Sequence, residues 1–191
     1  MRIEKFSNVS YKAKFLNKAE VKKLIKGSYP CSERKNVNFI KIESLNTDDI
    51  KALSNAAKYW QDSKFSTNIY YVACALRNES QYYKNHELYA LTEQETDFEK
   101  PDSDKLLGLV HVSPNDDGYT LIEHIEVNPK YLYIKEPEYR GLGTAMLNSI
   151  KQIYDRISCY PLSARSVINF YEKNGFVKQP ENYKYYTFSK K

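Results

Sequence analysis

The sequence predicts an α/β fold in which helices cover the faces of one mixed β-sheet. Short runs with strand-like alternation recur along its 191 residues, and between them lie longer segments whose apolar residues have helical spacing. A glycine-bearing turn, Arg140–Ala145, joins a strand-like run, Leu121–Val127, to a helical segment, Thr144–Ile157. A chain of this length has room for one domain with a substantial core.

Residues 1–36 are polar and rich in lysine. They contain one short helical pattern, Lys18–Lys26, which Gly27 and Pro30 would end. We therefore expect an N-terminal arm or cap over residues 1–36, followed by a single domain over residues 37–191.

The elements of that domain are predicted in the order β-α-α-β-β-β-α-β-α-β-β. The first helix begins at an N-cap candidate, Asn46, with acidic residues in its first turn, and Pro114–Gly118 has the chemistry of a hairpin turn. Tyr70–Val72, within the second helical pattern, is also compatible with an extended segment. The strands are expected at residues 37–42, 87–93, 106–112, 121–127, 157–160, 176–177 and 185–188, and the helices at residues 46–60, 69–83, 144–157 and 163–173.

The composition narrows the class of protein. A net charge of +5 is a mild basic excess that favours an anionic ligand, although a solvated surface rich in lysine accounts for it more simply. The cysteines Cys31, Cys74 and Cys159 are widely spaced, so neither a disulfide framework nor a metal site is expected. Met1–Phe6 lacks the apolar run of a signal peptide, and no segment could cross a bilayer. We expect a soluble, cytoplasmic protein with no membrane partner.

The glycine turn is suited to a diphosphate. The start of a helix presents unpaired backbone N–H groups and the positive end of the helix dipole, and Gly141 and Gly143 allow close approach of the backbone. Such turns also serve packing alone. A nucleoside triphosphate is disfavoured, because no Gly-Lys-Ser/Thr follows.

Three motifs, in this order and spacing, resemble the GNAT superfamily of acyl-CoA-dependent N-acyltransferases. Arg140–Ala145 is similar to the pyrophosphate loop of that family, Arg/Gln-x-x-Gly-x-Gly/Ala, and Tyr171–Phe176 to its closing Tyr-Glu-x-x-Gly-Phe. Ile122–Pro129 resembles its fourth strand, which ends in Val-x-Pro. The resemblance covers about residues 37–188 and is specific mainly over residues 121–177.

The resemblance implies a central, partly splayed mixed sheet and an N-acyltransferase. Acetyl would pass from acetyl-CoA to a primary amine by direct transfer in a ternary complex, without a metal. The pantetheine arm of coenzyme A would pair with the backbone of Ile125 and Val127. The residues implied at the pyrophosphate are Arg140, Gly141, Leu142, Gly143, Thr144 and Ala145.

The resemblance also implies two catalytic residues. Glu123 is the expected general base, acting through water, and Tyr171 the general acid that protonates the leaving thiolate. Period-2 geometry places Glu123 on the same face of its strand as Ile125 and Val127. A strand carboxylate in a surface ion pair and one more core aromatic residue are the competing interpretations of Glu123 and Tyr171.

Two other residues of the same strand are alternative bases. His124 and Glu126 fall on the opposite face by the same geometry. A single strand histidine such as His124 is more often a structural hydrogen-bonding group than a catalyst. Arg140 is either a ligand of the pyrophosphate or a surface residue before a turn.

Two features depart from the family pattern. Lys130–Pro137 is inserted before the glycine loop, where it shapes acceptor choice or forms a surface loop. Ala164 occupies a place where the family often has an asparagine that contacts the cofactor. The acceptor is open among a small molecule, a protein amine and an aminoacyl-tRNA, and so is the oligomeric state. The alternative function is a non-catalytic coenzyme A-binding or protein-interaction module on the same fold.

Overall fold

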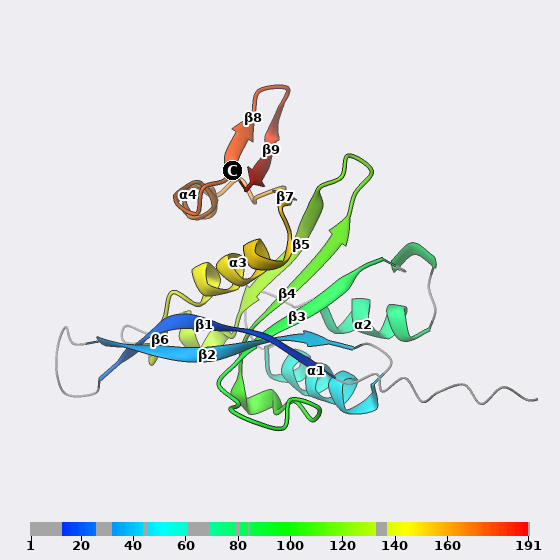
Figure 1. Ribbon diagram of the computed structural model, residues 1–191, viewed down its shortest axis with the longest axis vertical. Coiled ribbons are helices and arrows are strands. Elements are labelled where there is room, and N and C mark those ends of the chain that lie inside the picture. The colour runs from blue at the N-terminus through cyan, green and yellow to red at the C-terminus, as the bar shows by residue number, and fades with distance from the viewer. Residues whose placement is uncertain are drawn as a thin grey trace, which may run out of the picture.

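The computed structural model describes residues 13–25, 32–43, 46–60, 69–78, 81–83, 85–132 and 137–190, which form a mixed sheet and its covering helices (Figure 1). The predicted α/β architecture is confirmed. The strands are β1 (Lys14–Leu24), β2 (Ser32–Ile42), β3 (Glu87–Thr92), β4 (Leu106–Pro114), β5 (Thr120–Val127), β6 (Tyr139–Arg140), β7 (Arg156–Cys159), β8 (Val177–Gln179) and β9 (Asn182–Ser189), and the helices are α1 (Thr47–Trp60), α2 (Ile69–Arg77), α3 (Leu142–Ile153) and α4 (Arg165–Lys173).

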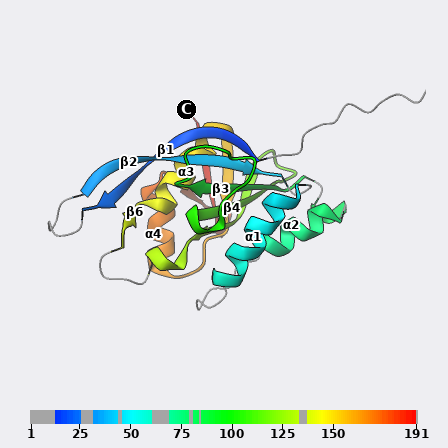
Figure 2. The same ribbon diagram turned by 90° about the horizontal axis from the view of Figure 1, so that it is seen from below.

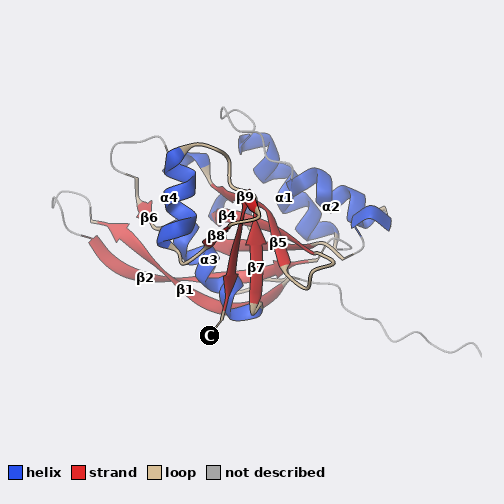
Figure 3. Ribbon diagram, turned by 90° about the horizontal axis from the view of Figure 1, so that it is seen from above, coloured by secondary structure: helices blue, strands red, loops and turns tan. Residues whose placement is uncertain are grey.

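The nine described strands form one sheet in the order β6-β1-β2-β3-β4-β5-β7-β9-β8. Neighbouring strands are antiparallel except β5 and β7, which are parallel. Figures 2 and 3 show α1 and α2 together on one side of the strands, apart from α3 and α4. Each side has its own core of buried side chains.

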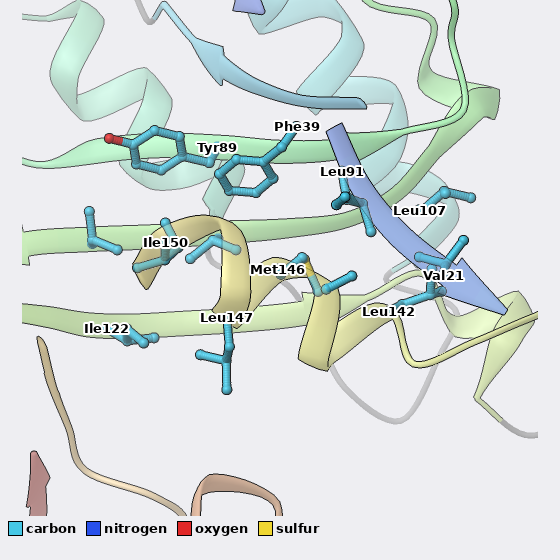
Figure 4. Close-up of a cluster of buried hydrophobic side chains, with 14 of the residues drawn as sticks. Val21, Phe39, Tyr89, Leu91, Leu107, Ile122, Leu142, Met146, Leu147 and Ile150 are labelled. Carbon is cyan, nitrogen blue, oxygen red and sulfur yellow. The ribbon is translucent and has the colours of Figure 1, made fainter. Parts of the chain in front are cut away.

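The core beneath α3 fixes the position of that helix. Met146, Leu147 and Ile150 are fully buried, and they face the strands in Figure 4. A Cβ atom added to Gly108 of β4 would lie 2.6 Å from the Met146 side chain, so the helix packs directly on bare strand backbone. This close packing holds the glycine turn at the start of α3 at a defined height above the sheet.

The helix predicted at Lys18–Lys26 is wrong, because residues 14–24 form strand β1. Lys26 itself lies outside the described residues. Ala19 and Val21 are buried and their neighbours exposed, which is the alternation of a strand. Pairing with β2 along the whole length of β1 outweighs the local helical preference of its lysines.

The other elements begin and end within a few residues of their predicted bounds, with three exceptions. The strand predicted from residue 37 begins at Ser32. The second helix ends at Arg77, and α3 ends at Ile153 rather than Ile157. No helix within the described ranges is both long and apolar enough to span a membrane. The division of the chain at residue 36 stays a prediction.

Candidate functional site

Strands β5 and β7 part after three residue pairs. They pair from Thr120–Ile157 to Ile122–Cys159, and residues 124–127 then pair with β4 alone among the described strands. The sheet is therefore splayed here, as the resemblance implied. Along this part of β5, which includes Ile125 and Val127, the edge that faces away from β4 has no neighbouring strand among the described residues. An extended ligand could pair with the backbone there as a strand would.

A β-bulge interrupts β5 at Glu123. Across the ladder with β4, His111 pairs with His124 and Val112 with Ile122, so Glu123 is an extra residue on β5. An extra residue shifts the alternation of side chains by one position. The bulge thus removes the basis on which the orientation of Glu123 was predicted.

The predicted face of Glu123 is wrong. Its carboxylate accepts a hydrogen bond from the Ser113 hydroxyl at 2.7 Å, and Ser113 shares a face of β4 with His111. Ile125 and Val127 pack instead against the core under α3. Glu123 therefore faces the side of the sheet that α1 and α2 cover.

The glycine turn has the geometry of an anion site. Gly141, the N-cap of α3, has φ 77°, and a Cβ atom there would meet nothing within 4 Å. The Ala145 N–H donates to the Gly141 carbonyl at 2.9 Å as the first bond of the helix. The N–H groups of Leu142, Gly143 and Thr144 precede that bond and have no acceptor within the helix. No side chain caps this helix start, so these donors can bind an anion.

A cavity of about 290 Å³ lies over this turn. It is lined by residues 140–144, by Val127 at the end of β5, and by Tyr131, Tyr139 and Phe170. The Tyr131 hydroxyl is buried and has no hydrogen-bond partner within the described residues. Such a group destabilises a fold unless a ligand or water satisfies it. The cavity is therefore suited to a ligand with hydrogen-bonding oxygens.

Strand β6 ties the glycine turn to the N-terminal part of the chain. It pairs with β1 at Lys22 and Lys23. The buried Tyr139 donates its hydroxyl to Glu93 at 2.7 Å and accepts from Lys35 at 3.0 Å. Burial, aided by the Glu93 charge, raises the pKa of Tyr139, so its hydroxyl stays protonated. Lys22, Lys23 and Lys35, which precede the range of the resemblance, thus help to hold the loop in place.

Tyr171 lies near the point where β5 and β7 part. It is buried on α4, with its ring centroid 5.3 Å from that of Phe176. Burial raises its pKa, and the nearby Cys159 adds to the rise. Cys159 pairs with Ile122, the residue before Glu123, in the last pair of the two strands. The fold therefore brings Tyr171 and Glu123 to one end of the divergence.

Cys159 itself is not a nucleophile at neutral pH. Burial raises the pKa of its thiol to about 12, which leaves it protonated. It is 1% exposed, so the interpretation as a small buried strand residue is confirmed.

Helix α4 packs against the first turn of α3. A Cβ atom on Gly143 would lie 3.1 Å from the Phe170 ring, so glycine at this position permits the contact. Ala164 is the N-cap of α4 and is exposed, and no side chain caps that helix start. The asparagine expected there from the family pattern is thus replaced by a residue with no polar side chain.

A row of histidines crosses the sheet beside Glu123. The chain has three histidines, and His86, His111 and His124 all belong to the row. His86 Nδ1 lies 2.7 Å from His111 Nε2, and His111 Nδ1 lies 3.2 Å from His124 Nδ1. Burial lowers the pKa of His111 to about 3, with help from the other two rings. Burial also lowers the pKa values of His86 and His124, against the opposing effect of Glu123.

Of these three histidines, only His124 was identified from the sequence as a candidate site residue. His86 and His111 are 25 residues apart, and only the pairing of β3 with β4 brings them together. Within the described parts of the chain, no three His, Cys, Asp or Glu side chains are grouped as metal ligands would be.

The predicted cofactor residues have different surroundings. Arg140 is exposed at the cavity rim, and residues 141–144 line the cavity. Ala145 is buried in the core and its N–H is already bonded, so it presents no donor. Of the insertion Lys130–Pro137, residues 133–136 lie outside the described residues. Tyr131 and Pro137 line the cavity, a contribution that the three motifs did not indicate.

Comparison with known proteins identifies structures that share the fold of this chain. No protein-family model and no curated protein matches the sequence. Solved structures match it in fold at low identity. A protein from Exiguobacterium sp. 255-15 that is assigned as an acetyltransferase has 17% identity and a TM-score of 0.51, over 81% of this chain and 94% of its own.

Two further structures match over a similar extent. NAA60 from Arabidopsis thaliana, in complex with a bisubstrate analogue, has 15% identity and a TM-score of 0.50, over 80% of this chain and 97% of its own. AtaTR with bound acetyl-CoA has 12% identity and a TM-score of 0.50, over 80% of this chain and 92% of its own. The chain therefore has the fold of the GNAT superfamily, as its three motifs predicted.

Proposed function

We propose that this protein is an acyl-CoA-dependent N-acyltransferase that transfers acetyl from acetyl-CoA to a primary amine. One observation supports this most directly. Strands β5 and β7 diverge after their last pair, Ile122 and Cys159. The glycine turn, an anion site that no side chain caps, lies on one side of this divergence, and Glu123 and Tyr171 lie at the end where it begins. A long ligand with a diphosphate, an amide-bearing arm and a reactive end would meet complementary groups along its whole length.

The glycine turn would hold the diphosphate of coenzyme A. The N–H groups of Leu142, Gly143 and Thr144 are oriented along the axis of α3, where the helix dipole also favours negative charge. Arg140 at the cavity rim adds a positive charge. The buried Tyr131 hydroxyl supplies one more hydrogen-bonding group in the lining of the cavity.

The pantetheine arm would lie along the unpaired edge of β5. Backbone groups of Ile125 and Val127 can pair with its amides as a neighbouring strand would. In this position the arm directs its thioester toward Glu123 and Tyr171. Bound acetyl-CoA supplies an activated acetyl group, and the protein supplies position and proton transfers.

Glu123 and Tyr171 would perform the two proton transfers of the reaction. Glu123 takes a proton from the acceptor ammonium, directly or through water, and the free amine then forms the C–N bond as the C–S bond breaks. Tyr171 donates its proton to the departing sulfur and regains one from the nitrogen, which loses its second proton as the amide forms. Because burial raises its pKa, Tyr171 is fully protonated before the reaction.

The acceptor class is a primary amine. NAA60, which has the same fold, was solved in complex with a bisubstrate analogue. Small molecules, protein amines and aminoacyl-tRNA are all compatible with the mild basic charge of this chain.

Two measurements test the proposal. Acetyl-CoA should raise the Tm of the purified protein, since a ligand that binds the native state stabilises it. Mass spectrometry should then find a mass increase of one acetyl group in a member of an amine panel: n-butylamine, spermidine, a lysine peptide and mixed aminoacyl-tRNA. Failure of the first measurement refutes the coenzyme A site. Success of the first and failure of the second favours a non-catalytic coenzyme A-binding module, an outcome that the missing polar side chain at Ala164 makes worth testing.

A further inference from the structure

The histidine row lies where the proposed reaction releases a proton. His124 follows Glu123 directly on β5, and the Glu123 carboxylate acts electrostatically on both His124 and His86. The row then runs from β5 across β4 to the start of β3. At that end His86 is half-buried beside Tyr82, whose side chain is 79% exposed. One end of the row is therefore next to the expected base and the other is near solvent.

Hydrogen bonds connect the row without interruption. His86 Nδ1 and His111 Nε2 are 2.7 Å apart, and His111 Nδ1 and His124 Nδ1 are 3.2 Å apart. Each contact needs one nitrogen with a proton and one without. Two assignments of neutral rings satisfy both contacts. In the first, His124 donates from Nδ1, His111 accepts at Nδ1 and donates from Nε2, and His86 accepts at Nδ1; in the second, both hydrogen bonds run in the opposite direction. Every ring then has one proton and is neutral.

We infer that the three histidines form a proton relay that removes the amine proton from Glu123 and delivers it to solvent at His86. The inference rests on the proposed function, which supplies the proton. The groups facing the row are Glu123 from β5 and Tyr82 and Tyr83 from the turn before β3.

The relay conserves protons and charge at each step. The Glu123 carboxyl group passes its proton to Nε2 of His124, and the proton on Nδ1 of His124 moves to Nδ1 of His111. The proton on Nε2 of His111 moves to Nδ1 of His86, and the proton on Nε2 of His86 passes to water. The net result is one proton transferred from Glu123 to water. Each ring is again neutral but carries its proton on the other nitrogen, and exchange of the ring protons with water restores the starting tautomers.

A buried row of this kind has no evident structural need for histidine. His111 is 2% exposed, and it shares a face of β4 with Leu109, which belongs to the core under α1 and α2. An apolar side chain would fill this position without the cost of desolvating two ring nitrogens. Imidazole has one property that an apolar or amide side chain lacks, which is that it accepts a proton on one nitrogen while it releases another.

The test uses glutamine at His111 and, separately, at His86. Glutamine keeps a donor and an acceptor but cannot pass a proton through its amide. With acetyl-CoA and the amine that the panel identifies, kcat should fall by about 100-fold, the lower end of what positioned acid–base groups contribute. The KM for acetyl-CoA should stay at the parent value. Added imidazole should restore part of the activity of His86→Gln, since His86 is the outer member.

Two controls distinguish the loss of proton transfer from a loss of folding or packing in the variants. Tyr82→Ala removes a ring neighbour of His86 that has no place in the relay, so its kcat should equal that of the parent. The Tm and its rise with acetyl-CoA are measured for every variant, and His86→Gln, at the half-buried end, keeps the test available if His111→Gln does not fold. In the parent, nitrogen-15 NMR of the three histidines should show His111 neutral from pH 5 to pH 8.

The outcomes distinguish the two proposals. If the parent turns over and both glutamine variants fold with unchanged kcat, the relay is refuted and the proposed function stands. If the variants lose activity but imidazole restores none to His86→Gln, the row is structural and the relay is refuted. If the parent binds acetyl-CoA and acetylates no amine, the proposed function fails and the relay fails with it.

Discussion

The Glu123 carboxylate accepts a hydrogen bond of 2.7 Å from the Ser113 hydroxyl, across the bulge between β5 and β4. The bond restricts the side chain of an otherwise exposed glutamate at the point where β7 parts from β5. Restricting a catalytic base in this way reduces the entropy lost in reaching the reactive geometry.

Substitution of Glu123 tests its role as the base. Glu123→Gln keeps the bond from Ser113 and removes the basic oxygen, so kcat should fall by about 100-fold with little change in Tm. Ser113→Ala should lower kcat by a smaller factor, because the carboxylate remains but is less restricted. Steady-state kinetics with acetyl-CoA and the identified amine measure both effects.

Glu126→Gln is the matched variant for that experiment. Glu126 is also on β5, and the sequence left it open as an alternative base. Its substitution should leave kcat close to that of the parent. A larger loss in Glu126→Gln than in Glu123→Gln would reverse the assignment.

Two glycines with nearly equal positive φ angles provide a test of the anion site. Gly141 has φ 77° at the start of α3 and Gly118 has φ 76° in the β4–β5 hairpin. Alanine at either position should cost about 1 kcal/mol of stability, since side chains disfavour this conformation. Only Gly141→Ala should also reduce the rise in Tm that acetyl-CoA produces, because only Gly141 lies at the cavity.

Thermal unfolding with and without acetyl-CoA separates the two effects. Gly118→Ala serves as the control for backbone strain. An equal rise in Tm for both variants and the parent would show that the glycine turn does not contact the ligand.

Tyr171→Phe removes the proposed proton donor and little else. The ring remains in its contact with Phe176, while the leaving sulfur loses its donor. We expect kcat to fall by about 100-fold, with unchanged binding of acetyl-CoA, measured by the release of free thiol. Since burial raises the pKa of Tyr171, the parent should not lose activity through ionisation of this tyrosine as the pH rises to 10.

Tyr185→Phe is the control for loss of a tyrosine hydroxyl. Tyr185 donates to Asp117 at 2.9 Å in the hairpin region, away from the open part of β5. Its substitution should leave turnover unchanged. Equal activities of Tyr171→Phe and the parent would refute the role of Tyr171 as the acid.

The sequence predicted the order of most elements and the glycine turn at the start of α3, because both depend on local patterns. The glycine turn and the helical spacing after it are contained in a few consecutive residues. Strand β1 was missed for the opposite reason. The local pattern of Lys18–Lys26 is compatible with a helix, whereas strand β1 as a whole pairs with residues of β2 up to 27 positions away.

The orientation of Glu123 and the histidine row were not predictable from the sequence. A bulge is a property of two paired strands, and the glutamate at position 123 does not by itself indicate one. His86 and His111 are likewise neighbours only through the register of β3 and β4. Alternation along one strand predicts a face correctly only where the ladder is regular.

A buried carboxyl group at the start of α1 gives the fold a pH dependence. Asp49 is fully buried, and burial raises its pKa to about 7, although the Glu43 N–H and the Asn46 amide donate to it at 2.8 and 3.1 Å. In the unfolded chain the pKa is about 3.9. The folded state therefore binds this proton more tightly, and the resulting stability is complete below pH 4 and lost as the pH rises to 7.

Replacement of Asp49 by asparagine should remove this dependence. The parent should lose stability between pH 4 and pH 7 by a few kcal/mol, since one pKa unit corresponds to about 1.4 kcal/mol, and Asp49→Asn should lose less. The control is Asp48→Asn, an identical change at the exposed neighbouring residue, which should keep the slope of the parent. Urea unfolding at a series of pH values measures the three slopes. If Asp49→Asn and the parent have the same slope, Asp49 is ionised in the folded protein, and the two donated hydrogen bonds outweigh its burial.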